Sequence, residues 1–240
     1  GFHLACDATN REAVRILRSR KGRPSKPLAV MMATLEDISR HCQVSDEERK
    51  LLASQQCPIV LLRWRDDSTV VADVAPKNLY LGAMLPYTPL HHLLLFRDSP
   101  GLPGKNQARV YVMTSGNLSE EPIAKDNQEA LDRLASIADA FLLHDRDIHI
   151  HADDSVVRIF RQSPVPLRRA RGYAPFPVQL PVSVQPILAA GAEMKNTFCL
   201  TNGSYAIVSQ HIGDMENLET LEAFRSAVQH FMRIFRVRPQ

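Results

Sequence analysis

The sequence of 240 residues lacks most of the patterns that announce a particular chemistry. It contains no G-x-S-x-G, Walker A or Rossmann glycine pattern, which disfavours a nucleophilic enzyme relative to one that works by orienting its substrates. No apolar run approaches the roughly 18 residues that span a bilayer. The first residues show no signal-peptide pattern. These absences predict a soluble, intracellular protein.

The sequence also has few cysteines and a small net charge. Four cysteines, Cys6, Cys42, Cys57 and Cys199, form no C-x-x-C pair and no metal-ligand spacing, which is typical of reduced thiols in a cytoplasmic protein. The 29 basic residues exceed the 26 acidic ones by only three, too few to argue for wholesale wrapping of nucleic acid. A local basic site remains possible.

Three cations lie within six residues in K-G-R-P-S-K-P, residues 21–27. Lys21, Arg23 and Lys26 follow a helix and precede an apolar strand, and the two prolines stiffen the turn between them. This arrangement suits an anion. The alternative is that these cations are solvated or complement the dipole at the end of the helix.

Capping residues and apolar periodicity indicate an α/β protein. Capping boxes at Thr9–Glu12 and Ser45–Glu48, with further caps at Thr34 and Asp126, predict helix starts, and another short helix is expected near Leu90. Strands are expected at 1–6, 28–32, 58–62, before Thr114, 138–143 and 155–160. Residues 100–107 are expected to be a Gly/Pro-rich loop.

The last quarter of the chain differs in composition. A proline-rich segment, 174–186, predicts an extended linker. Asn202-Gly203 predicts a hairpin between strands at 196–201 and 205–209, and apolar residues at helical spacing from Leu218 to Phe235 predict a long helix. The abrupt start and the stop after this helix suggest an excised piece of a longer polypeptide.

Three polar turns are candidates for a shared anion site: 21–26, 114–119, and Ser155 with the basic run 167–172. Arginine and lysine side chains bind phosphate oxygens, and Ser and Asn side chains with backbone N–H groups can complete an anion-binding nest around them. Together the turns would suit a triphosphate. The alternatives are an ordinary Gly/Asn turn at 114–119, and an exposed strand or an RNA-binding patch at 167–172.

Histidines and aspartates cluster twice. On a strand, His149, His151 and Asp153 would face one way, an arrangement that suits metal ligands, but no second cluster supplies further ligands. A polar loop at the edge of a pocket is therefore the favoured interpretation. His211 and Asp214 suit a metal or substrate as well as they suit a capping loop before the last helix.

The order of the motifs resembles a known family. K-G-R-P-S-K-P-L-A-V-M, P-Y-T-P-L-H, T-S-G-N-L-S, D-D-S-V-V-R and R-R-A-R-G-Y-A-P are similar to the YrdC-like domain of the HypF carbamoyltransferases. A-A-G-A-E-M-K-N-T-F-C-L and S-Q-H-I-G-D-M-E-N resemble the start of the ASKHA-type domain that follows it. The resemblance implies a YrdC-like twisted mixed sheet flanked by helices at 1–180, a linker at 181–186, and a truncated ASKHA-type (RNase H-like) segment at 187–240.

The resemblance also implies an activity. In the HypF family the YrdC-like domain uses ATP, with Mg²⁺ on the phosphates, and carbamate derived from carbamoyl phosphate to form carbamoyl-adenylate. The ASKHA-type domain then passes the carbamoyl group to the C-terminal cysteine of HypE during [NiFe]-hydrogenase maturation. The fragment alone is not expected to complete this transfer. No side chain is expected to act as a nucleophile, because in-line attack on a phosphate needs positioning and charge neutralisation.

By motif match, the resemblance assigns the phosphates and nucleotide to one set of residues and the carbamate end to another. The first set is Lys21, Arg23, Lys26, Ser115, Asn117, Ser155 and one of Arg168, Arg169 or Arg171; the second is Tyr87, Thr88 and His91. Which arginine matches stays open. Two rivals remain: a threonylcarbamoyl-adenylate synthase for tRNA modification, which lacks the Q-H-I-G-D tail, and a non-catalytic module that binds double-stranded RNA.

Overall fold

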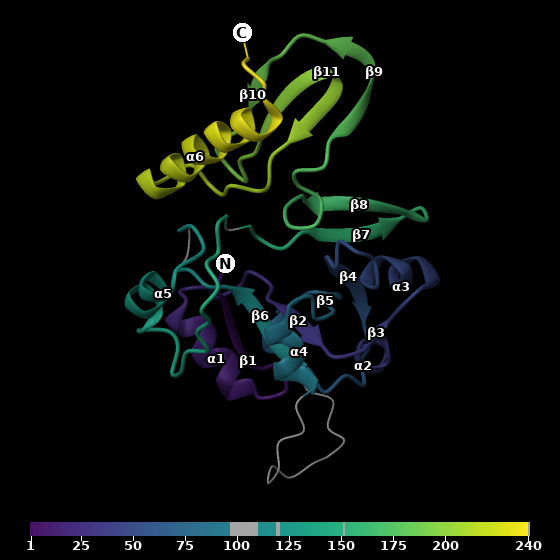
Figure 1. Cartoon of the computed structure of the whole chain (residues 1–240). Coiled ribbons are helices and arrows are strands. Elements are labelled where there is room, and N and C mark those ends of the chain that lie inside the picture. The colour runs from purple at the N-terminus through teal and green to yellow at the C-terminus, as the bar shows by residue number, and fades with distance from the viewer. Residues whose placement is uncertain (97–109, 119–120, 151, 240) are drawn as a thin grey trace.

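The computed structural model describes residues 1–96, 110–118, 121–150 and 152–239, which form two sheets with flanking helices (Figure 1). The larger sheet has the strand order β1-β6-β2-β5-β4-β7-β8, with β3 paired to β4. The β2–β5 and β4–β7 pairs are parallel and the others are antiparallel. The expected mixed sheet flanked by helices is confirmed. Its strands are β1 (His3–Asp7), β2 (Ala29–Met32), β3 (Cys42–Gln43), β4 (Ile59–Trp64), β5 (Tyr80–Met84), β6 (Val110–Ser115), β7 (Val156–Phe160) and β8 (Ser163–Arg168).

Local capping sets the helix starts of this part of the chain. Its helices are α1 (Arg11–Arg20), α2 (Leu35–His41), α3 (Asp46–Leu52), the 3-10 turn η1 (Ala72–Val74), α4 (Pro89–Phe96) and α5 (Asn127–Leu134). The caps at Thr34, Ser45 and Asp126 are confirmed, and Ser45 forms the full capping box. The box at Thr9 is wrong. Asn10 caps α1 instead, because the Thr9 hydroxyl donates to the Asp7 carboxylate at 2.7 Å.

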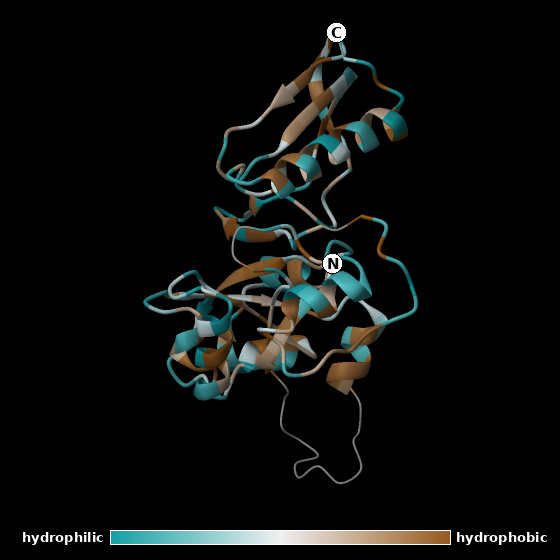
Figure 2. Cartoon of the chain, turned by 90° about the vertical axis from the view of Figure 1, so that its left-hand side faces the viewer, coloured by the Kyte–Doolittle hydropathy of each residue, from teal (hydrophilic) through white to brown (hydrophobic). Residues whose placement is uncertain are grey.

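The large core lies between the sheet and these helices. Val30, Leu62 and Val112 are fully buried on central strands, and Val14, Ile38 and Leu52 from the helices join the same cluster. Figure 2 shows brown, hydrophobic residues along strands of the larger sheet, and helices that carry both brown and teal residues. No helix in the described part of the chain has the length and apolar character to cross a membrane.

One expected strand of this region is absent, one observed strand was not expected, and one expected loop is not described. The strand predicted at 138–143 is wrong: the segment forms no strand, and Leu142 is 62% exposed. Strand β5 was not predicted from the sequence. Glycine fits at position 82 of this strand, because an added Cβ would lie 2.9 Å from the Ile59 side chain. The expected loop at 100–107 lies outside the described residues.

The smaller sheet has the order β10-β11-β9, formed by β9 (Val178–Val184), β10 (Leu188–Ala190) and β11 (Phe198–Val208). The predicted hairpin is confirmed within β11: the Ser209 amide donates to the Phe198 carbonyl at 2.8 Å, and Gly203 has φ +57° at the reversal. Helix α6 (Leu218–Phe235) packs Val228 and Phe231 against Phe198, Leu200 and Ile207.

Most of the proline-rich segment at 174–186 is extended, and residues 178–184 of it belong to the smaller sheet. Val178–Val184 pairs with β11 as strand β9, because its single proline, Pro181, leaves enough backbone groups for an antiparallel ladder. The division of the chain into domains therefore stays a prediction. Beside this segment, β8 forms the outer strand of the larger sheet, and Pro164 and Pro166 face Ile159 and Val157 of β7.

Candidate functional site

The basic turn after α1 is built on a buried arginine. Arg18 is 7% exposed, and its guanidinium donates to four backbone carbonyls: Asp73 at 2.5 Å, Arg23 at 2.8 Å, Val74 at 2.9 Å and Lys26 at 3.1 Å. These bonds offset the cost of burying a charge. They fix the path of residues 23–26 against η1, so the turn has a defined shape before any ligand binds.

Lys21 connects this turn to the one that follows β6. Its ammonium donates to the Ser115 carbonyl at 2.7 Å, and to the carbonyl and side-chain oxygens of Asn117 at 2.6 and 2.7 Å. Burial first, and the charge of Arg23 second, lower the pKa of Lys21 to about 8, while Asp153 acts in the opposite sense. Three acceptors match the three protons of an ammonium group. Lys21 therefore shapes the turn as well as contributing charge.

The turn itself, Ser115–Asn117, is closed by its own side chains. The Ser115 hydroxyl donates to the Asn117 side-chain oxygen at 2.7 Å, and the Asn117 amide group donates to the Glu121 carbonyl at 2.5 Å. Gly116 lies against Phe2, whose carbonyl oxygen would be 2.8 Å from an added Cβ. The second of the three predicted polar turns thus lies beside the first.

Arg23 and Arg168 form a cationic group, since the charge of Arg168 acts on Arg23. Asp153 contacts the Arg168 guanidinium. Burial is the main cause that lowers the pKa of Arg23, and the charge of Arg168 lowers it further, whereas the charge of Asp153 raises it. The Nε atoms of Arg23 and Arg168 are both buried and have no hydrogen-bond partner among the described residues. Buried donors are normally paired. Three cations, Lys21 included, one carboxylate and two unpaired N–H groups suit an anion with several oxygens, such as a phosphate chain.

The three arginines of the basic run have separate surroundings. Arg169 donates to the carbonyls of Val208, Tyr173 and Phe176, at 2.7, 2.7 and 2.5 Å. Arg171 donates to Asp154 at 2.9 Å and to the carbonyls of Gln56 and Cys57 at 3.1 and 2.8 Å. Of the three, Arg168 is the one whose charge acts on Arg23. It is therefore our choice for the phosphate arginine that the sequence left ambiguous.

Ser155 and Lys26 lie differently from the other predicted phosphate residues. Ser155 is fully buried; its hydroxyl donates to the Arg171 carbonyl and accepts from the Ala170 amide, both at 2.8 Å. It thereby fastens the arginine run to the start of β7, which favours a positioning role. Lys26 is exposed, and its carbonyl accepts from Arg18.

A buried polar network around Asp154 adjoins the cationic group. Asp154 accepts from Tyr87 Oη at 2.9 Å and Arg171 Nε at 2.9 Å, and it lies 3.0 Å from His3 Nε2. Burial alone would raise the pKa of Asp154, but the hydrogen bonds and charges of His3 and Arg171 outweigh it and hold the pKa well below its usual range. Burial and the Asp154 charge raise the pKa of Tyr87. The network is thus ionised at Asp154 and neutral at Tyr87.

His91 completes this network from the first turn of α4. Its ring lies edge-on to Tyr87, with centroids 4.6 Å apart, and Thr88 caps the turn by accepting from the His91 amide at 3.2 Å. Burial first, and the charge of His3 second, lower the pKa of His91 to about 4. Its Nδ1 atom is buried and has no partner within the described ranges. His91 is therefore neutral at pH 7 and offers one unused hydrogen-bonding position.

The two clusters meet on one face of the sheet. His3 pairs with Ser115 across β1 and β6, which places both side chains on the same face. Asp153 and Asp154 are consecutive, one in each cluster, and the Asp154 amide donates to Asp153 Oδ1 at 2.9 Å. One continuous site therefore runs from the basic turn to His91.

The histidine-rich segment before Asp153 does not form the strand on which the metal arrangement depended. Residues 145–150 are turns and irregular chain, and His151 lies outside the described residues. His149 contacts His230 of α6, with ring centroids 5.9 Å apart. Among the described residues no group of three or more His, Cys, Asp or Glu could hold a metal ion. In the second predicted pair, Asp214 accepts from the Lys195 amide at 2.6 Å.

Several residues of the site escaped the sequence interpretation. Arg18, His3 and Asp154 each have a role in the geometry, but their partners lie far along the chain; His3 and Asp154 are 151 residues apart. Asp153 was considered only as a metal ligand. Of these residues, Arg18 had a local signal in the sequence, because it follows Val14 and Leu17 on the side of α1 that is buried.

Comparison with known proteins gives two family matches. Residues 1–170 match the Sua5–YciO–YrdC family, described as telomere recombination, and residues 183–240 match the HypF Kae1-like domain. The whole chain is 49% identical to carbamoyltransferase HypF2 of Cupriavidus necator and 48% identical to carbamoyltransferase HypF of Synechocystis. It spans 31% and 30% of their lengths, about a third of each.

A solved structure shows the same architecture. The crystal structure of full-length HypF in its phosphate- and nucleotide-bound form superposes on the whole chain with a TM-score of 0.92 at 46% identity. The chain covers 36% of that protein. The similarity extends across both sheets, so the arrangement described above is that of the related structure.

Proposed function

The chain belongs to the Sua5–YciO–YrdC family, in the HypF form that joins this domain to a Kae1-like one, and we propose that it binds ATP and forms carbamoyl-adenylate. One observation carries the proposal. In the cationic group next to the Ser115–Asn117 turn, two buried guanidinium N–H groups, on Arg23 and Arg168, have no partner in the part of the chain that the structure describes. A phosphate chain supplies the acceptors that these groups lack.

The proposed reaction needs charge neutralisation more than a protein nucleophile. A carbamate oxygen attacks the α-phosphorus of ATP, the bond from that phosphorus to the bridging oxygen of the leaving group breaks, and pyrophosphate departs with the electron pair. Arg23 and Arg168 stabilise the negative charge on the phosphates, and Lys21 holds the Ser115–Asn117 turn against them. Preorganised donors of this kind require no rearrangement during the reaction.

The network around Asp154 is proposed to receive the carbamate. The neutral His91 presents its unpaired Nδ1, and Tyr87 and Arg171 are held in place by Asp154. Tyr87 lies beneath Arg171, whose guanidinium carbon is 3.4 Å from the ring centroid. Thr88 contributes by capping α4 and so fixing His91.

Mg²⁺ is proposed to enter with the nucleotide. The described residues offer no group of ligands for a dedicated ion, and Asp153, the carboxylate nearest the cations, already contacts Arg168. Mg²⁺ commonly binds through substrate phosphates and retains several waters. Bound in this way, it would supply further charge neutralisation.

In the complete protein, the carbamoyl group is proposed to come from carbamoyl phosphate and to pass to the C-terminal cysteine thiol of a HypE-type acceptor during hydrogenase maturation. The thiolate sulfur attacks the carbamoyl carbon, and AMP leaves. This proposal rests on the HypF relatives, of which the chain spans about a third.

Calorimetric titration with ATP tests the binding step. Arg23→Ala and Arg168→Ala are expected to raise the Kd at least tenfold, because each loses a charge-assisted contact to phosphate. Arg161→Ala, on the exposed turn after β7, is the matched control and is expected to bind as the wild type does. Unchanged affinity in both test variants would contradict the assignment.

ATP–pyrophosphate exchange in the full-length protein tests the chemistry. Exchange is expected with carbamoyl phosphate. Exchange that requires bicarbonate and threonine would instead identify a threonylcarbamoyl-adenylate synthase. Absence of ATP binding, together with salt-sensitive binding of double-stranded RNA, would favour the non-catalytic RNA-binding alternative.

A further inference from the structure

His211 belongs to the second matched region, yet it touches the cationic group of the first. Its amide donates to the Arg169 carbonyl at 2.9 Å, and its Nδ1 atom lies 3.6 Å from Asp153 Oδ2. Its side chain is 20% exposed and that of Asp153 is 18% exposed. The site built from residues 1–170 is therefore bordered by an imidazole from beyond residue 183.

The backbone around His211 is fixed from both sides. The Arg169 guanidinium holds the Val208 carbonyl at 2.7 Å, three residues before His211. After it, the Ile212 amide donates to the Asn196 carbonyl at 2.9 Å, and the Asn196 amide donates to the Gly213 carbonyl at 2.8 Å. The imidazole is thus presented to Asp153 by a braced segment.

Asp153 is shared between two partners. Its Oδ2 atom contacts Arg168 and lies within ion-pair distance of His211, and its Oδ1 atom accepts from the Asp154 amide. A carboxylate beside a phosphate site opposes anion binding, because like charges repel at short range. A positive or hydrogen-bonding group on the far side of Asp153 reduces that repulsion and keeps the carboxylate from turning toward the phosphates.

We propose that His211 is a positioning residue for the nucleotide site: its imidazole borders Asp153 and keeps that carboxylate from turning toward the phosphates, so that Arg168 keeps its charge available to the phosphate chain. The proposal rests on the proposed ATP site. It assigns to the Kae1-like segment a part in the pocket of the preceding domain, so that the pocket is complete only when both segments are docked.

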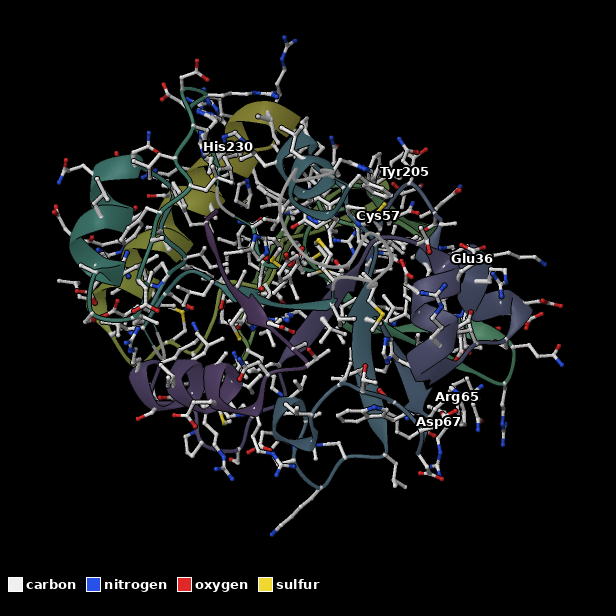
Figure 3. All side chains as sticks on the ribbon, turned by 90° about the horizontal axis from the view of Figure 1, so that it is seen from below. Glu36, Cys57, Arg65, Asp67, Tyr205 and His230 are labelled. Atoms are coloured by element: carbon white, nitrogen blue, oxygen red, sulfur yellow. The ribbon has the colours of Figure 1, made fainter. Side chains whose placement is uncertain are left out.

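Affinity measurements on the full 240-residue chain test this role. His211→Leu keeps the bulk of the side chain and loses the ring nitrogens. It is expected to weaken ATP binding about tenfold, the effect of losing one contact to the charged Asp153. His211→Gln, which keeps an N–H donor, is expected to recover most of this loss. A merely structural role would not distinguish the two. His230→Leu is the matched control, since His230 projects from α6 in the same segment and contacts His149 (Figure 3).

An NMR titration of the His211 imidazole tests the contact without a nucleotide. The charged groups around His211 are Asp153, Arg168, Asp214 and Lys195. Asp153→Asn removes one negative charge and is expected to lower the pKa of His211, whereas Asp132→Asn on the distant α5 is expected to leave it unchanged.

The outcomes separate this inference from the function on which it rests. A wild-type chain that binds no ATP would sink the proposed function and this role with it, while the NMR titration would still report the contact. A wild-type chain that binds ATP, combined with unaltered affinity in His211→Leu, would overturn the positioning role alone. An unaltered His211 titration in Asp153→Asn would show that the contact carries no energy.

Discussion

Lys21 and Asn117 are 96 residues apart in the chain and share two hydrogen bonds, from the Lys21 ammonium to the carbonyl oxygen of Asn117 at 2.6 Å and to its side-chain oxygen at 2.7 Å. A third bond reaches the Ser115 carbonyl. The basic turn after α1 and the polar turn after β6 are therefore one unit. A change in either is expected to disturb both stability and anion binding.

Lys21→Met should lower the free energy of unfolding by about 3 kcal/mol, because the carbonyl oxygens of Ser115 and Asn117 lose the ammonium donor and the Asn117 side-chain oxygen keeps only the Ser115 hydroxyl. Urea denaturation followed by circular dichroism measures the change. Lys50→Met, at an exposed position of α3, is the control and should stay within about 0.5 kcal/mol of the wild type. Equal stability of the two variants would mean that the Lys21 bonds contribute little.

His91 should make stability depend on pH in the acid range. Its pKa is lowered from 6.5 to about 4 in the folded protein, chiefly by burial. As the pH falls, the unfolded chain takes up this proton first, so stability is lost between about pH 6.5 and 4. His91→Phe should lose about 2 kcal/mol less than the wild type across this interval, a difference that denaturation at pH 7 and pH 4 would reveal. Parallel pH profiles would contradict the buried, neutral state of His91.

Arg169 should control how firmly the second sheet is attached. Arg169→Ala removes three bonds to the carbonyls of Tyr173, Phe176 and Val208 and should cost about 2 kcal/mol, seen as faster amide exchange in β11. Arg169→Lys should restore little, because a single ammonium cannot reproduce the planar fork. Arg161→Ala should exchange like the wild type; accelerated exchange there too would point to a general charge effect.

Gly172 should tolerate no side chain. It has φ +86°, and an added Cβ would lie 2.5 Å from the Gln56 carbonyl, which Arg171 also binds. Gly172→Ala should therefore destabilise the fold by about 3 kcal/mol. Gly203→Ala isolates the backbone effect, since Gly203 has φ +57° with open space around it, and should cost about 1 kcal/mol. Similar losses at both positions would remove the packing argument.

Features with a local cause were predictable from the sequence. The Ser45–Glu48 capping box and the Asn202-Gly203 reversal each depend on a few adjacent residues, and the structure contains both. The amphipathic pattern of α6 likewise needs only helical spacing. The apolar run at 138–143 failed, because hydrophobicity alone does not supply a partner strand.

The candidate site was only partly predictable. Motif similarity selected Lys21, Arg23 and the 168–171 run, but it did not separate residues that face a ligand from residues that hold the frame. The side chains of Arg169 and Ser155 donate their hydrogen bonds to backbone carbonyls of the fold. His3 lies beside Ser115 only because β1 pairs with β6. Such roles depend on contacts across long stretches of chain, which no local pattern encodes.

The outer strand β8 affects how copies of this molecule behave at high concentration. An uncovered sheet edge normally offers backbone N–H groups to which a strand of another molecule can add. Pro164 and Pro166 have none, and because they alternate with Val165 they interrupt the same side of the strand. The larger sheet is thereby protected from polymerising through this edge, although β8 is almost wholly exposed.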